Sequence, residues 1–154
     1  MRFPSLARCA VVAALVVATG CSSNLGPSDV AGTYALRAVA GDALPTVVST
    51  GFYTEGPPVV LADTIRLRAD GTGTRSRTIM SGTDPYNIGA GVSRAVFDLV
   101  VHVDGRRVDL RYACPPNASC VGIGAAHLTT IGLTIDATAD ARGPQVYQRV
   151  AGEP

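Results

Sequence analysis

The chain has 154 residues, with 13 basic against 12 acidic side chains and a formal net charge of +1. Such a balance gives no long-range attraction for nucleic acid, so we expect no nucleic-acid partner. All of the basic side chains are arginine, which excludes lysine Schiff-base chemistry and a P-loop lysine.

The first 20 residues have the layout of a secretory signal peptide. Arg2 and Arg8 give a positive start, and residues 9–17 form an uncharged apolar run. This run is too short for a membrane-spanning helix, which needs about 20 apolar residues. Ala18-Thr19-Gly20-Cys21 follows and resembles the bacterial lipobox. The resemblance implies a diacylglycerol on Cys21 and cleavage before it; the alternative is an ordinary signal peptide that is cleaved nearby.

A lipid on this cysteine would hold the mature chain at a membrane of the cell envelope, because two or three acyl chains anchor a protein stably. Ser22 follows the cysteine, where an aspartate would resemble the inner-membrane retention signal of Gram-negative cells. We therefore expect a lipid-anchored envelope protein, at the outer membrane if the cell is Gram-negative. Residues 21–29 are small and polar and predict a flexible tether. Residues 30–154 are enough for one domain.

The four cysteines divide into two groups. Cys9 leaves with the signal peptide and Cys21 carries the lipid, which leaves Cys114 and Cys120. In an oxidising envelope compartment we expect these two to form a disulfide, worth about 2 kcal/mol on the chain-entropy model. A zinc site is the alternative, but two cysteines without a nearby histidine are poor zinc ligands, so we expect no metal site.

Alternating apolar and polar residues predict a series of β-strands in the mature chain. In the first of them, Tyr34, Leu36 and Ala38 share one face. Asp70-Gly71 and Asp104-Gly105 are typical of tight hairpin turns, because glycine accepts a positive φ. The predicted strands are residues 33–39, 63–68, 92–103, 107–112, 126–131, 133–137 and 145–150.

These strands predict an all-β domain: an antiparallel up-and-down barrel of about eight strands or, alternatively, a two-sheet β-sandwich. Three segments resemble the lipocalin-like lipoproteins of bacteria, in which Gly-x-Trp/Tyr opens the first strand and aromatic-x-Arg closes the last. The segments are residues 30–36, 69–72 and 146–149. The resemblance implies that Arg149 lies across the ring of Tyr34 at the closed end of a barrel, as a cation–π pair.

Two Gly- and Pro-rich loops, residues 51–58 and 81–91, carry aromatic side chains. Phe52 and Tyr53 lie in the first loop and Tyr86 in the second. Aromatic residues on loops often mark binding surfaces. The alternative is that they fold back over the opening of a barrel.

No catalytic, metal or cofactor motif stands out in the chain, and neither His102 nor His127 has a partner in a recognisable nucleophile motif. We therefore expect a monomeric, non-enzymatic protein without a cofactor. It would bind a small apolar ligand or an envelope component, in an apolar pocket of at least about 300 Å³. The alternative is a protein-interaction or structural module that uses Phe52, Tyr53 and Tyr86.

Overall fold

The computed structural model describes residues 25–47, 58–81, 91–115, 117–118, 122–136 and 143–151. Five residues with a predicted role lie outside this part of the chain, and the predictions made for them stay predictions: Cys21, Phe52, Tyr53, Tyr86 and Cys120.

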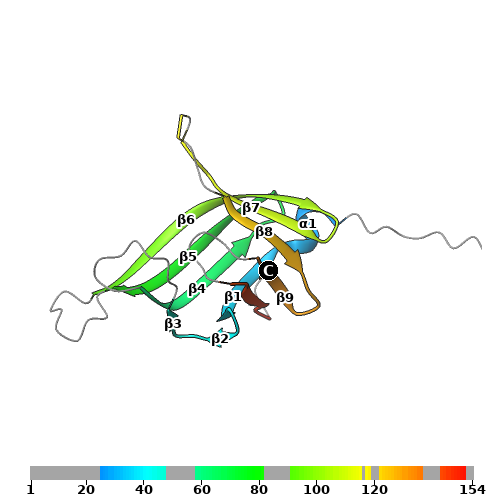
Figure 1. The fold of residues 1–154 in the computed structure, drawn as a ribbon. Coiled ribbons are helices and arrows are strands. Elements are labelled where there is room, and N and C mark those ends of the chain that lie inside the picture. The colour runs from blue at the N-terminus through cyan, green and yellow to red at the C-terminus, as the bar shows by residue number, and fades with distance from the viewer. Residues whose placement is uncertain are drawn as a thin grey trace, which may run out of the picture.

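The strands form a closed antiparallel barrel of eight strands (Figure 1). Strand follows strand around the barrel in chain order from β4 to β10, and β1 pairs with both β10 and β4 to close it. Two short strands, β2 (Asp42–Ala43) and β3 (Thr46–Val47), attach to β1 and β4. The barrel strands are β1 (Gly32–Val39), β4 (Val59–Leu67), β5 (Thr72–Ser81), β6 (Gly91–Asp104), β7 (Arg107–Tyr112), β8 (Gly122–Leu128), β9 (Gly132–Ile135) and β10 (Gln145–Arg149).

The predicted up-and-down barrel is therefore confirmed, and the sandwich is not what the chain forms. The two predicted hairpin turns are confirmed as well. Gly71 has a φ of +80° between β4 and β5, and Gly105 has a φ of +57° between β6 and β7. Both φ values lie in the left-handed region, in which the backbone of any residue that carries a Cβ is strained.

The predicted face of the first strand is wrong at one residue. Tyr34 and Leu36 are buried as expected, but Ala38 is only half-buried and Val39 takes the next core position. A register shift between Leu36 and Ala38 in the pairing with β10 explains the change. A β-bulge of this kind inserts one residue and moves the following side chains to the other face.

One end of the barrel, called here the closed end, is covered by the short helix α1 (Pro27–Val30), which contacts β6. Val30 is fully buried, and the hydroxyl of Tyr34 donates a 2.7 Å hydrogen bond to its carbonyl. The helix begins within residues 21–29, which were expected to be a flexible tether, so this prediction is wrong for residues 27–29. No helix among the residues seen here is long and apolar enough to cross a membrane.

The pair that the lipocalin-like resemblance suggested lies at the closed end. Tyr34 and Arg149 are cross-strand neighbours, and the guanidinium carbon of Arg149 lies 5.9 Å from the centroid of the tyrosine ring. Arg149 also donates to the carbonyl of Ala31. Gly32 leaves room for this side chain, since a Cβ there would lie 2.9 Å from Nε of Arg149.

The opposite end, called here the open end, carries β2, β3, the end of β5 and the start of β6 (Figure 1). The apolar core includes Ile65, Leu67, Leu99 and Val101 toward the closed end, and it continues to the buried Val39 and Val60 near β2 and β3. Toward the open end, by contrast, the first eight residues of β6 are all exposed.

Candidate functional site

A buried ion pair lies in the barrel interior between the apolar core and the open end. Arg75 of β5 is 1% exposed and Asp63 of β4 is 2% exposed. Nε of Arg75 donates to Oδ1 of Asp63 at 3.1 Å, and Nη2 donates to Oδ2 at 2.7 Å. This two-pronged geometry is the one that a guanidinium and a carboxylate favour.

Four further side chains from three strands complete this cluster, which we call the polar layer. Arg77 donates from Nε to Asp63 at 2.7 Å and from Nη2 to Gln145 at 3.3 Å. Nη2 of Arg75 also reaches Gln145 at 3.0 Å and the hydroxyl of Tyr147 at 3.1 Å, while Nη1 reaches Tyr112 at 3.2 Å. The polar layer therefore consists of Asp63, Arg75, Arg77, Tyr112, Gln145 and Tyr147.

Charge and burial together explain why the polar layer is stable. Among the described residues, no buried side-chain nitrogen or oxygen lacks a hydrogen-bond partner. Burial lowers the pKa of the Arg75 guanidinium, but the hydrogen bonds and charge of Asp63 oppose this effect, so its pKa lies above its ordinary value and the group stays charged. Burial also raises the pKa of Tyr147, with the Asp63 carboxylate adding to the effect, and Tyr147 stays a neutral hydroxyl.

Next to the polar layer the barrel wall opens at the seam between β1 and β4. The two strands pair over only four residues, from Gly32↔Leu67 to Ala35↔Thr64. Beyond this point each strand carries a register shift, between Leu36 and Ala38 in β1 and between Val60 and Ala62 in β4. Bulges bend their strands, and here β1 continues to pair with β2 while β4 pairs with β3.

Two adjoining hollows occupy this opening. The seam hollow has a volume of about 360 Å³, and the rim hollow beside it, at the open end, has about 530 Å³. Ala43 lines both, and Asp63 of the polar layer lines the seam hollow. The seam hollow is lined by Ala35, Leu36, Arg37, Ala43, Leu44, Leu61, Ala62, Asp63 and Thr64, and the rim hollow by Val39, Ala40, Asp42, Ala43, Pro45, Thr46 and Val47.

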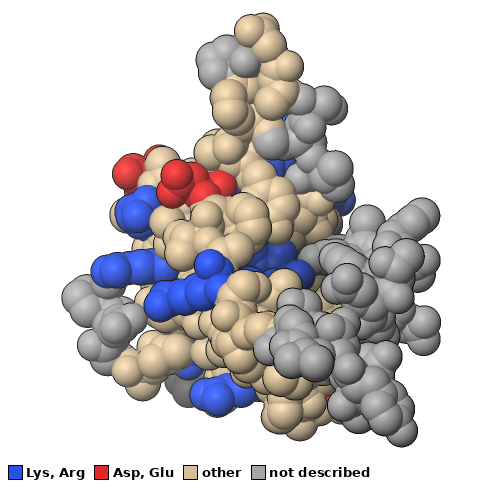
Figure 2. All heavy atoms as spheres, turned by 90° about the vertical axis from the view of Figure 1, so that its left-hand side faces the viewer, with Lys and Arg blue, Asp and Glu red and all other residues tan. Residues whose placement is uncertain are grey.

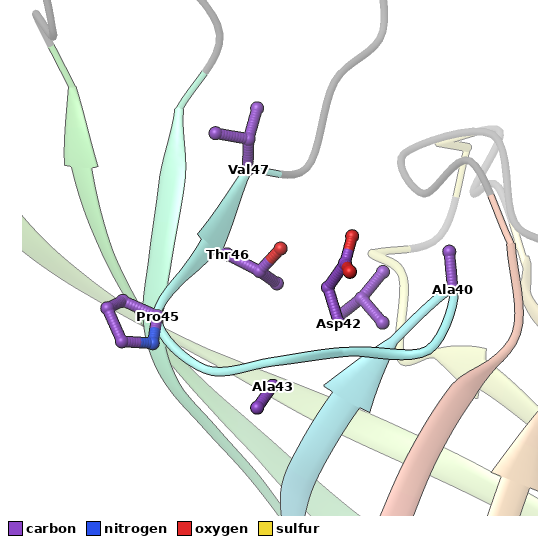
Figure 3. Close-up of a pocket in the computed structure, with 7 residues that line it drawn as sticks. Ala40, Asp42, Ala43, Pro45, Thr46 and Val47 are labelled. Atoms are coloured by element: carbon purple, nitrogen blue, oxygen red, sulfur yellow. The ribbon is translucent and has the colours of Figure 1, made fainter.

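Figure 3 shows how the segment from Ala40 to Val47 shapes the rim hollow. The side chains of Asp42, Thr46 and Val47 stand on one side of the segment, whereas Ala43 points to the other side. Both hollows thus have mixed polar and apolar linings and are open to solvent at the barrel edge. The mixed lining differs from the apolar pocket that the sequence predicted.

The inner face of the open end is partly apolar as well. Phe97 of β6 lies opposite Arg75 in register, and its ring centroid is 5.1 Å from that of Tyr112. Leu99, two residues further along the same face, is buried, whereas Phe97 is 41% exposed. Figure 2 views this end of the molecule and shows arginine side chains running across the middle of the face.

The residues predicted from sequence do not meet in one site. Tyr34 and Arg149 lie at the closed end, and neither lines the seam hollow or the rim hollow. Cys114 lies two residues after the end of β7, and its expected partner Cys120 is outside the described residues, so this pairing stays a prediction.

Neither histidine contributes to the polar layer. Nε2 of His127 lies 3.2 Å from Oδ2 of Asp136, and both side chains are more than half exposed. His102 lies on β6 with Asp109 as its cross-strand neighbour. Within the described ranges, no three histidine, cysteine or acidic side chains come together as a metal site.

Sequence reasoning missed the polar layer, although a signal for it was present. Asp63 alternates with the apolar Ile65 and Leu67, and this alternation predicts that all three side chains share the inward face. The turn at Asp70-Gly71 then places Arg77 opposite Asp63. A carboxylate on a buried face with an arginine as its cross-strand neighbour predicts a buried ion pair.

Comparisons with protein-family models, with curated proteins and with solved structures found no match to this chain.

Proposed function

We propose that this chain is an envelope lipoprotein of the lipocalin-like kind, anchored through lipid on Cys21, whose barrel binds a small apolar ligand or an envelope component without converting it. The observation that carries the proposal is the pair of adjoining hollows at the β1–β4 seam. They lie beside a fully hydrogen-bonded polar layer, and pockets of 300–1,000 Å³ with a few placed polar groups are typical of small-molecule sites.

The position of the anchor relative to the hollows fits this proposal. Cys21 precedes Pro27 by six residues, which span at most about 20 Å when extended. The helix α1 follows at the closed end, whereas the rim hollow lies at the open end. A lipid on Cys21 would therefore tether the barrel by the end that is remote from the binding site.

Native mass spectrometry of the protein extracted from its own membrane tests this proposal. We expect the mass of a chain that begins at an acylated Cys21, a loss of two hydrogens for the Cys114–Cys120 disulfide, and an additional mass from a bound ligand. A chain that begins elsewhere and carries no acyl group would contradict the anchor. Release of no ligand on activation would contradict the binding role.

A matched pair of variants tests the position of the site. Ala43→Trp places an indole where the two hollows meet, and Ala125→Trp places the same group in a smaller hollow, of about 230 Å³, on the outside of β8. With the neutral apolar dye N-phenyl-1-naphthylamine, we expect Ala43→Trp to weaken binding by about tenfold and Ala125→Trp to leave it unchanged. Equal effects of the two substitutions would place the site elsewhere.

A second candidate function is a protein-interaction module. The sequence suggested that Phe52, Tyr53 and Tyr86 form its contact surface. An observation on the described residues also favours this function, because Val92, Val96 and Val100 of β6 are all more than half exposed. Alternate residues of a strand lie on one face, so these valines share the outside of the barrel with Arg94 and Asp98, which lie between them.

A further inference from the structure

The first half of β6 forms an open strand edge. Residues Gly91–Phe97 pair with β5 on one side, but β7 ends at Tyr112, which lies opposite Leu99. No described strand pairs with the other side of this stretch, which we call the edge segment. A strand edge whose peptide groups are not paired by any described strand is a template for strand addition.

The direction of the free peptide groups follows from two printed hydrogen bonds of the same strand. The amide of Val101 donates to Gly71, on the β5 side, and the carbonyl of Asp98 accepts from Ala113, on the β7 side. Along a strand, the amide and carbonyl groups of successive residues point to opposite sides of the strand in alternation. The amide and carbonyl groups of Val92, Arg94 and Val96 therefore point away from β5, toward the open edge.

The side chains of the edge segment do little to block such pairing. It contains no proline and no lysine, which are the residues that commonly protect an edge strand. Its outward side chains are Val92, Arg94 and Val96, and the two valines are 64% and 62% exposed. Arg94 donates to the hydroxyl of Ser76 at 2.8 Å, and among the described residues its guanidinium forms no ion pair.

We propose that the edge segment binds an extended peptide segment of another protein by strand addition, and that this peptide carries an acidic residue opposite Arg94 between two apolar residues. Main-chain hydrogen bonds would supply affinity, and the alternating side chains would supply selectivity. The inference does not depend on the lipid anchor or on the hollows at the seam.

Charge explains why a second copy of this chain is the poorer occupant. Arg94 is the central residue of Gly91–Phe97, so an antiparallel pair of two complete edge segments places Arg94 opposite Arg94 of the second copy. Like charges directly opposite each other destabilise a strand pair. A carboxylate in the same place would be attracted instead.

The test uses the mature full-length protein in detergent and a fluorescein-labelled peptide, Thr-Val-Thr-Asp-Thr-Val-Thr, with a second peptide that has Arg in place of Asp. Binding is measured by fluorescence anisotropy. We expect the wild type to bind the Asp peptide about fivefold more tightly than the Arg peptide, and Arg94→Glu to reverse this order. An unchanged order in Arg94→Glu would overturn the proposal.

A second pair of variants tests the main-chain contact. Val96→Pro removes an amide that points to the open edge, whereas Val96→Thr keeps both the amide and the branched side chain. We expect Val96→Pro to weaken binding about tenfold and Val96→Thr to leave it close to wild type, with equal melting temperatures. Wild-type affinity for the peptide in Val96→Pro would overturn the proposal. It would also be overturned if sedimentation showed that the free wild-type protein is a dimer and that Val96→Pro is a monomer, because the edge segment would then bind a second copy.

Discussion

The two ends of this barrel are built from the same strands but differ in how their side chains are used. At the closed end, α1 covers an apolar core, and Tyr34 and Arg149 hold the helix to the last strand. At the open end, the strands separate at the β1–β4 seam, and β6 extends beyond its partner β7. The polar layer lies between these two regions.

This difference indicates a division of roles along the barrel axis. A core of packed apolar side chains supplies most of the stability of a small domain. Binding sites are commonly formed by the less stable parts of a fold, which a rigid scaffold holds in place. We therefore assign stability to the closed end and binding to the open end, with the polar layer fixing the strands at the boundary.

The largest effect should follow from removing the carboxylate of the polar layer. Asp63→Ala leaves the guanidinium of Arg75 buried without its main partner, so we expect the free energy of unfolding to fall by about 3–5 kcal/mol. Asp109→Ala is the control, because its ion pair with Arg107 is partly exposed to solvent and should contribute less than about 1 kcal/mol. Urea denaturation measures both, and equal losses would contradict the assigned role of the layer.

Two truncations within β6 compare the halves of the barrel directly. Leu99 is buried in the core, so Leu99→Ala should cost about 2–5 kcal/mol. Phe97 lies on the same face but is partly exposed, and Phe97→Ala should cost less than about 1.5 kcal/mol, mainly through the lost contact with Tyr112. A larger loss for Phe97→Ala in urea denaturation would show that the open end also stabilises the fold.

The attachment of α1 should have a smaller effect. Tyr34→Phe removes the donor to the carbonyl of the buried Val30 while keeping the ring, so we expect a loss of about 1–2 kcal/mol. The amides near the end of α1 should also exchange faster with solvent. An unchanged stability of Tyr34→Phe would mean that the helix is held by packing alone.

The smallest predicted effect is the dependence of the free energy of unfolding on pH, which should appear only at alkaline pH. Burial raises the pKa values of Tyr34 and Tyr147 above 10.0, so the folded state holds these protons more tightly than the unfolded state. The stabilisation is fully present below pH 10 and is lost as the pH rises above it, by up to about 1.4 kcal/mol per pH unit and group. Tyr147→Phe should lose stability less steeply above pH 10, and an identical slope would contradict the prediction.

Local patterns in the sequence predicted much of the fold. Alternation along β6 and β7 and the glycines at Gly71 and Gly105 define hairpins between neighbours in sequence, and such short-range features can be recognised without a structure. The polar layer depends instead on distant residues. Arg75 meets Gln145 and Tyr147 only because closure of the barrel brings β10 close to β5.

The seam hollows could not be predicted for a related reason. They exist because β1 and β4 each carry a bulge just beyond their four-residue pairing. A bulge depends on how the two partner strands fit together, and the alternation of a single strand does not reveal it. The wrong inward position of Ala38 is the local sign of the same bulge.

Native-state hydrogen exchange along β6 tests the division between the two ends most directly. The amides of Ala95, Leu99 and Val101 all point toward β5, so they differ in their place along the barrel and not in their hydrogen-bonding partner strand. We predict that Leu99 and Val101 exchange only through global unfolding, while Ala95 exchanges through local opening with a clearly lower free energy. Equal opening free energies for Ala95 and Val101 would contradict a stable closed end and an adaptable open end.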